Sequence, residues 1–164
     1  KNEAFSGKAV EIMSVTNQIK IAILEKLKEQ FPGHKRYSEE IKQGFQAPCF
    51  FLATINNQSE QKTIGKRYMR TISFDLHFFP PKDTEGRNNE RMYAVGDLLY
   101  MLLEVVRIPE QFVYGSDMHF EIADGVLHFF VDYKVFVYRQ TEPDAYMEKL
   151  NVERAVLKKW EMNK

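Results

Sequence analysis

The Asp124-Gly125 dipeptide constrains the fold of this chain more than any other feature. Because a type I′ turn requires positive φ angles at both central positions, this pair is the strongest short signal for a β-hairpin. A two-residue turn here places Ile122 opposite Leu127, and both residues are apolar. It also places the polar residues Glu121 and His128 opposite each other. Since a slip of one residue would destroy this matching, the sequence predicts a closing hairpin in this register.

The second strand of this hairpin is expected to run from residue 126 to about residue 139. At about 3.3 Å per residue it is about 45 Å long, which is more than a domain of this size needs. Its core face is apolar, yet the opposite face also carries the large side chains of Phe130, Phe136 and Tyr138. Large exposed apolar surfaces usually mark contacts with a partner. We therefore expect part of this strand to extend beyond the core and to contact another protein chain.

The remaining patterns predict two helices and further strands. In chain order they are a helix at 14–31, a short strand or extended link at 36–41, a strand buried on both faces at 49–55, a polar hairpin loop at 56–65, a half-buried strand at 68–79, and a helix whose apolar stripe runs from Met92 to Val106. Strands that cluster, rather than alternate singly with helices, favour the α+β class. The predicted fold is a single domain at 13–140, an antiparallel β-sheet of long hairpins with two helices packed on one face.

Two segments are expected to lie outside this domain. Residues 1–12 contain no apolar signal-peptide core and are expected to be a disordered leader or an added extension. Residues 141–164 are charged, but Val152, Val156 and Trp160 have the spacing of a short amphipathic helix. This C-terminal extension is therefore predicted to include a docking helix.

Composition argues against several classes of protein. Lys plus Arg and Asp plus Glu both number 23, so the zero net charge gives no long-range attraction to nucleic acid or to an anionic membrane. No apolar run approaches the roughly 20 residues that a membrane-spanning helix requires. Cys49 is the only cysteine, which excludes an intramolecular disulfide and favours a reducing cytosol. Its position in an apolar run predicts a buried structural thiol rather than a nucleophile.

Motifs for catalysis are missing from the sequence. It contains no P-loop, no glycine-rich dinucleotide-binding motif, no nucleophile elbow and no metal-binding cysteine pair. The alternative is a metal site on the outward face of the sheet, to which His77, His119 and His128 would contribute. Because polar residues alternate outward on any half-buried strand, this pattern needs no metal to explain it. We therefore predict a non-enzyme without catalytic residues, metal or cofactor, and keep the three histidines as candidate ligands.

A group of positive charges surrounds the end of the first long hairpin. Its members are Lys62, Lys66, Arg67 and Arg70. One interpretation is contact with a phosphate or an acidic partner, of which an acidic protein surface fits the neutral net charge better than nucleic acid, and the other is a solvated strand edge that its charges keep from aggregating. Together with Phe130, Phe136 and Tyr138, these four residues are the candidate interface.

Three stretches together resemble the tail terminator family of tailed phages and prophages of Gram-positive bacteria. They are residues 43–51 with the run Ala47-Pro48-Cys49-Phe50-Phe51, residues 67–80 with the run Ser73-Phe74-Asp75-Leu76-His77, and residues 124–133. One helix precedes them and another lies between the second and the third, so the likeness covers about residues 14–140. It includes neither residues 1–12 nor the basic tail around Trp160.

The resemblance implies a structural virion protein, siphophage- or myophage-like, that acts as a ring, typically a hexamer. Such a ring caps the head-proximal end of the tail tube, ends its polymerisation and offers a surface to a neck or head-completion protein. The implied partners are copies of itself, the tail tube protein and a neck protein, with no membrane and no specific nucleic acid. The implied location is the bacterial host cytoplasm during assembly and then the virion tail. A head–tail connector or tail-completion protein of similar fold, and a metal-dependent enzyme that uses the three histidines, remain open alternatives.

Overall fold

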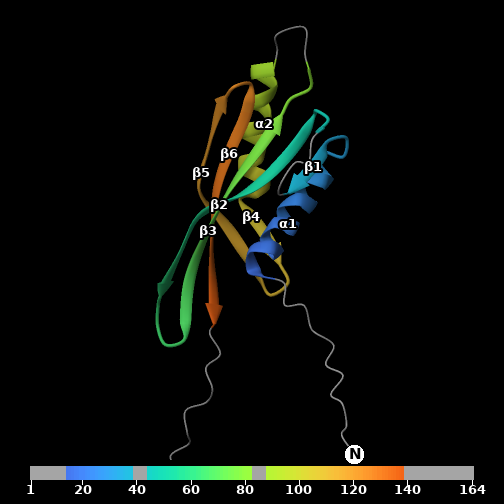
Figure 1. Ribbon diagram of the computed structural model, residues 1–164. Coiled ribbons are helices and arrows are strands. Elements are labelled where there is room, and N and C mark those ends of the chain that lie inside the picture. Colours follow the sequence, from blue (N-terminus) through green and yellow to red (C-terminus); the bar gives the residue numbers. More distant parts are fainter. Residues whose placement is uncertain (1–13, 39–43, 83–87, 139–164) are drawn as a thin grey trace, which may run out of the picture.

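The computed structural model describes residues 14–38, 44–82 and 88–138, without the side chains of residues 56–58. These residues form two helices and six strands. In chain order they are α1 (Val15–Gln30), β1 (Lys35–Ser38), β2 (Cys49–Lys62), β3 (Arg67–Phe79), α2 (Asn88–Leu103), β4 (Val105–Ile108), β5 (Gln111–Ala123) and β6 (Val126–Tyr138). The strands form one curled sheet in the order β1-β2-β3-β6-β5-β4 (Figure 1). The predictions for residues 1–12 and 141–164, including the docking helix, lie outside the described residues.

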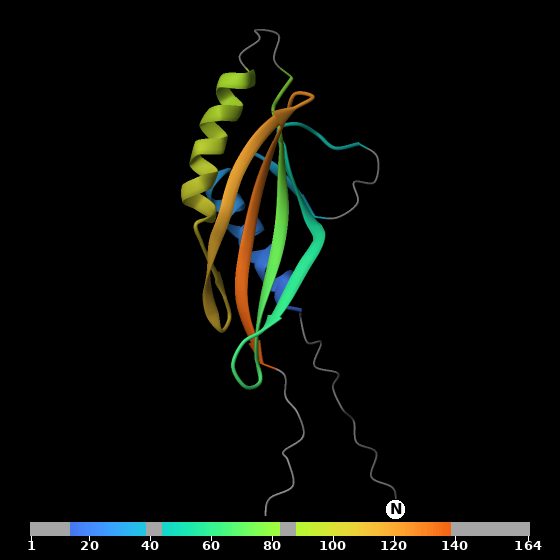
Figure 2. The same ribbon diagram turned by 90° about the vertical axis from the view of Figure 1, so that its left-hand side faces the viewer.

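Both helices pack against the sheet around one hydrophobic core (Figures 1 and 2). The helices contribute Ile19, Ile23 and Leu27 from α1 and Met92, Leu99 and Leu103 from α2. The two central strands contribute alternate residues, which are Ile72, Phe74, Leu76 and Phe78 from β3 and Leu127, Phe129, Val131, Tyr133 and Val135 from β6. Because side chains alternate across a strand, the residues between them lie on the opposite, outer face. The predicted α+β class with both helices on one face is confirmed.

The closing hairpin has the predicted register. Ile122 pairs with Leu127 and Glu121 pairs with His128. The two turn residues have φ angles of 51° and 74°, as a type I′ turn requires. Beyond the turn, β6 pairs with β3 along almost its whole length, as far as Tyr138. The long strand expected from the sequence is therefore present, and it lies at the centre of the sheet between β3 and β5.

The first long hairpin extends further than the sequence predicts. The stretch at 56–65, predicted as a loop, is mostly strand, because β2 continues to Lys62 and there pairs with Tyr68 of β3. Only residues 63–66 form the turn. The prediction is wrong because residues 59–62 are exposed, so their strand needs no apolar alternation. A register shift between Ile55 and Ser59 interrupts the pattern further.

The sheet is mixed rather than wholly antiparallel. β1 begins at Lys35, one residue before the predicted stretch at 36–41, of which residues 39–41 lie outside the described residues, and it pairs parallel to β2. Two strands pair in parallel only if the connection between them returns the chain to the same end of the sheet. No local sequence pattern predicts the path of that connection. The strand at 49–55 is buried on both faces only at its start, where Cys49 and Phe50 are both buried; beyond them Leu52 is buried, whereas Phe51 and Ala53 on the opposite face are half-buried.

The second helix ends earlier than predicted, at Leu103 rather than Val106. The apolar residues that follow belong to β4, where Val106 and Ile108 are buried and Arg107 between them is exposed. Val105, Val106 and Ile108 fit a helical stripe and a strand alternation equally well. The sequence pattern alone could therefore not decide between a longer helix and a new strand.

Hydrogen bonds from α1 and β6 hold the C-terminal end of α2. The Lys26 ammonium donates to the Leu102 carbonyl (2.9 Å), and the buried Tyr133 hydroxyl donates to the Leu103 carbonyl (2.8 Å). Since the last carbonyls of a helix have no partner within the helix, these bonds satisfy groups that burial would otherwise leave unpaired. They also explain in part why α2 ends where it does.

Replacing Tyr133 with Phe should lower the free energy of unfolding by about 1–2 kcal/mol, because the ring stays packed while the Leu103 carbonyl loses its partner. Burial raises the pKa of the Tyr133 hydroxyl far above its usual value, so the group is a neutral donor at physiological pH. Urea unfolding followed by circular dichroism measures the change. The control is Tyr114→Phe, because the Tyr114 side chain on β5 is 65% exposed. Equal stability of the two variants would mean that the hydrogen bond from Tyr133 to the Leu103 carbonyl does not stabilise the fold.

Candidate functional site: the outer sheet face

The outer sheet face comprises the side chains that point away from both helices. They include Phe51 and Ala53 from β2, Ser73, Asp75, His77 and Phe79 from β3, His128, Phe130 and Asp132 from β6, and His119 and Glu121 from β5. Most of them are half-buried although neither helix covers them. The rings crowd one another, and Phe51 makes a T-shaped contact with the His77 ring at 5.5 Å. The face therefore presents polar groups within an aromatic surround.

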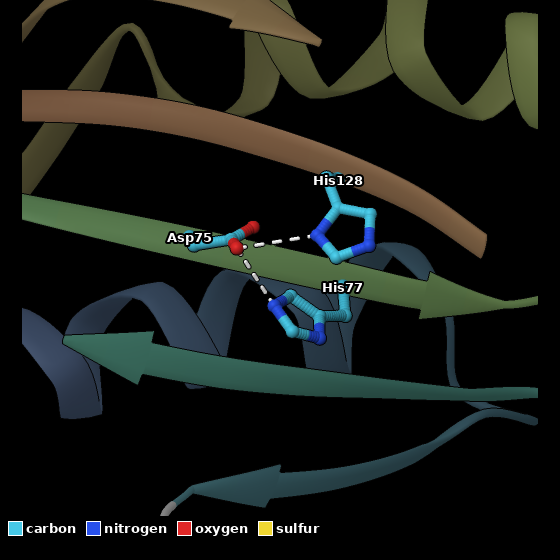
Figure 3. Close-up of polar contacts among 3 residues, drawn as sticks. All are labelled: Asp75, His77 and His128. Carbon is cyan, nitrogen blue, oxygen red and sulfur yellow. Dashed lines mark hydrogen bonds and ion pairs between the residues drawn. The ribbon is translucent and has the colours of Figure 1, made fainter. Parts of the chain in front are cut away.

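Two histidines and one aspartate meet on this face (Figure 3). Nε2 of His77 lies 2.8 Å, and Nδ1 of His128 lies 3.2 Å, from the same oxygen, Oδ2 of Asp75. The centroids of the two imidazole rings are 4.2 Å apart. The register of β3 on β6 causes this arrangement, because it places His77 directly opposite His128. Within the described part of the chain, this is the one group of three or more His, Cys, Asp or Glu residues whose ligand atoms all lie within 4.8 Å of one another.

His119, the third candidate ligand, lies apart from this group. It pairs with Phe130 across β5 and β6, and the two rings stack with centroids 4.8 Å apart. Its Nδ1–H donates to the Asp117 carbonyl (3.1 Å). Phe130 is also the cross-strand partner of Asp75, so its ring stands between His119 and that carboxylate. The structure thus brings together two of the three candidate histidines, joined by an aspartate.

The far end of the outer face extends away from the helices, on β6 and the β2–β3 hairpin (Figures 1 and 2). Here Phe136 and Tyr138 are 54% and 63% exposed. Phe136 pairs with Met69 of β3, and the Arg67 guanidinium lies 5.1 Å from the centroid of the Tyr138 ring. We call these four residues the distal aromatic patch. Phe130, the third candidate aromatic residue, is half-buried and lies outside this patch.

The four candidate basic residues do not form one cluster. Arg70 makes an ion pair with Glu60 (2.7 Å), which offsets its charge. The strand alternation places Arg70 and Lys62 on the helical side of the sheet, whereas Arg67 belongs to the distal aromatic patch. Lys66 is exposed in the turn that joins β2 to β3. The fold therefore does not gather these four residues into a single positively charged contact surface.

Several exposed apolar residues escape the sequence patterns. Ile64, in the β2–β3 turn, is 86% exposed, and Phe112 and Tyr114 on β5 are 60% and 65% exposed. Ile64 is a single apolar residue in a polar stretch, so no periodicity marks it. Phe112 and Tyr114 flank the buried Val113, and this alternation was the available signal.

Cys49 is fully buried, as the sequence predicts, and burial raises the pKa of its thiol. A thiol that is both inaccessible and hard to ionise is a poor nucleophile. In the part of the chain that the structure describes, no helix is long and apolar enough to cross a membrane.

Comparison with known proteins gives one informative match. A family model described as "Phage tail terminator protein" matches residues 18–145. No curated protein matches the chain. Several solved structures match the chain, and one of them has 12% identity and a TM-score of 0.39 over 79% of this chain and 98% of its own, a likeness too weak to support an argument. The family match spans every strand and nearly all of both helices, and it confirms the resemblance inferred from the residues. The chain therefore belongs to the phage tail terminator family and is a structural protein of the phage tail.

Proposed function

We propose that this protein assembles with copies of itself into a ring, hexameric as the family resemblance implies, that caps the tail tube, ends its polymerisation and joins the tube to the neck. The observation that carries the proposal is the distal aromatic patch, in which two aromatic side chains are more than half exposed at the far end of a central strand. An exposed aromatic cluster with an arginine is typical of protein interfaces. The ring forms in the bacterial host cytoplasm and acts through contacts rather than catalysis.

The strand edge beside this patch supports the same role. β1 pairs with β2 only at residues 49–52, so the far half of β2 has no strand on its other side among the described residues. Its residues 59–62 are exposed and carry hydrogen-bonding groups that a neighbouring subunit can pair with. A neighbour that covers the distal aromatic patch would therefore find an open edge next to it.

The β2–β3 turn is the proposed contact with the tube. It projects beyond the helices, and it combines the 86% exposed Ile64 with the exposed ammonium of Lys66 (Figure 1). An apolar side chain that meets water on every side gains most when a partner covers it, and the adjacent charge suits an acidic partner surface.

The double substitution Ile64→Asp with Lys66→Glu should abolish capping and leave self-assembly unchanged, because it alters the turn and not the distal aromatic patch. The assay mixes the protein with polymerising tail tube protein and measures tube lengths by electron microscopy. Wild-type protein should give short tubes of uniform length, and the double variant should give long ones. The matched control is Met101→Asp, because the Met101 side chain is 70% exposed on α2.

Two outcomes would overturn parts of this proposal. Wild-type protein that binds tubes without changing their length would indicate a head–tail connector or tail-completion protein instead. A double variant that shortens tubes as well as the wild type does would remove the turn from the tube contact.

A further inference from the structure

The carboxylate of Asp75 is shared and incompletely satisfied. Its Oδ2 atom accepts hydrogen bonds from both His77 and His128, while its Oδ1 atom is buried and has no hydrogen-bond partner among the described residues. Buried polar atoms are nearly always paired with protein, water or an ion, so an unpaired carboxylate oxygen beside two imidazoles calls for an explanation. A cation that both carboxylate oxygens approach, held between the three side chains, would provide one.

The spacing of the three side chains fits a tetrahedral metal ion. Ligands at 2.0–2.1 Å from zinc are about 3.3 Å from one another when the geometry is tetrahedral. The two nitrogen-to-oxygen distances in the group are 2.8 Å and 3.2 Å, and all ligand atoms lie within 4.8 Å of one another. We propose that Asp75, His77 and His128 bind a divalent transition metal ion of the zinc class.

The ligand set selects the class of metal. Two imidazoles and one carboxylate suit zinc, cobalt or nickel, whereas calcium and magnesium require oxygen ligands. A neutral imidazole carries its proton on either ring nitrogen. The protons that now point at Asp75 can therefore move to the other nitrogens, and this frees Nε2 of His77 and Nδ1 of His128 to coordinate.

The surroundings hold the ligands in place. β3 and β6 are central strands with neighbours on both sides, so the backbone beneath the group is rigid. The Phe51 ring contacts His77, and the Phe130 ring lies nearly parallel to His128 at 6.4 Å. Three protein ligands would leave a fourth position for water or for a group from a neighbouring subunit. The inference concerns the single chain and does not depend on ring formation or tube capping.

Zinc binding to the full chain tests this proposal. The protein is purified without a polyhistidine tag, stripped with EDTA and titrated with zinc against a chromophoric chelator. We expect saturable binding that weakens at least about tenfold in His77→Gln and in His128→Gln. His119→Gln is the matched control, because His119 lies on the same face outside the group, and it should bind zinc as the wild type does. Circular dichroism checks that each variant is folded.

Cobalt provides a second measurement that needs no variant. The unsubstituted protein should develop the intense visible absorption of tetrahedral cobalt, and zinc should displace it. Zinc binding that is equal in wild type and both ligand variants, or that is lost in His119→Gln, would overturn the assignment. So would a wild-type chain that binds neither ion.

Discussion

Replacing Phe136 with Asp should convert the proposed ring into folded monomers. Phe136 is 54% exposed in the single chain, so the substitution removes little packing within the subunit. In a subunit interface the same change deletes a central aromatic side chain and would bury a carboxylate without a partner. Truncated hot-spot residues typically cost about 2 kcal/mol or more, and the buried charge adds to this. Because the loss recurs at every interface, a closed ring is more sensitive to it than a dimer would be.

Multi-angle light scattering at matched concentrations measures the mass of each assembly. Met101→Asp introduces the same charge on α2 at a residue of greater exposure, and it should keep the wild-type mass. Thermal unfolding should show both variants folded. If wild type and Phe136→Asp have the same mass, the distal aromatic patch is not the ring contact.

Local patterns predicted the parts of the fold that neighbouring residues determine. The closing hairpin follows from one dipeptide and the alternation on each side of it, so its register could be worked out from residues 120–129 alone. The parallel pairing of β1 with β2 depends on residues separated by a connection without a periodic pattern. The far half of β2 is polar on both faces. Its backbone hydrogen bonds to β3 do not require particular side chains, so the sequence pattern could not predict this part of the strand.

The outer face was predictable only as two separate halves. Alternation identifies Asp75 and His77 as outward on one strand, and His128 and His119 as outward on the closing hairpin. Which of them meet depends on the register between β3 and β6, which are separated in sequence by α2, β4 and β5. That register puts His128 opposite His77, and it places Phe130 between Asp75 and His119. A shift of two residues would have preserved every alternation and assembled a different group.

Gly115 marks a second long-range constraint, where β5 passes the end of α2. A Cβ atom at this position would lie 2.8 Å from the Leu103 carbonyl oxygen and 3.2 Å from Val131 Cγ2. The Gly115 N–H also donates to the Glu104 carbonyl (2.8 Å), which holds the two segments at this separation. Because the closest atom belongs to the backbone, it cannot rotate away as a flexible side chain could.

Gly115→Val should therefore lower the free energy of unfolding by about 3 kcal/mol, more than Tyr133→Phe. The end of α2 must move away from β5, and this weakens both the Gly115 bond to Glu104 and the Tyr133 bond to Leu103. Gly33→Val is the control, because a Cβ atom at Gly33 meets nothing within 4 Å. Urea unfolding of both variants measures the difference. If they differ by less than about 0.5 kcal/mol, close contact at Gly115 does not limit stability, and the hydrogen bonds at the end of α2 tolerate a wider separation than the structure suggests.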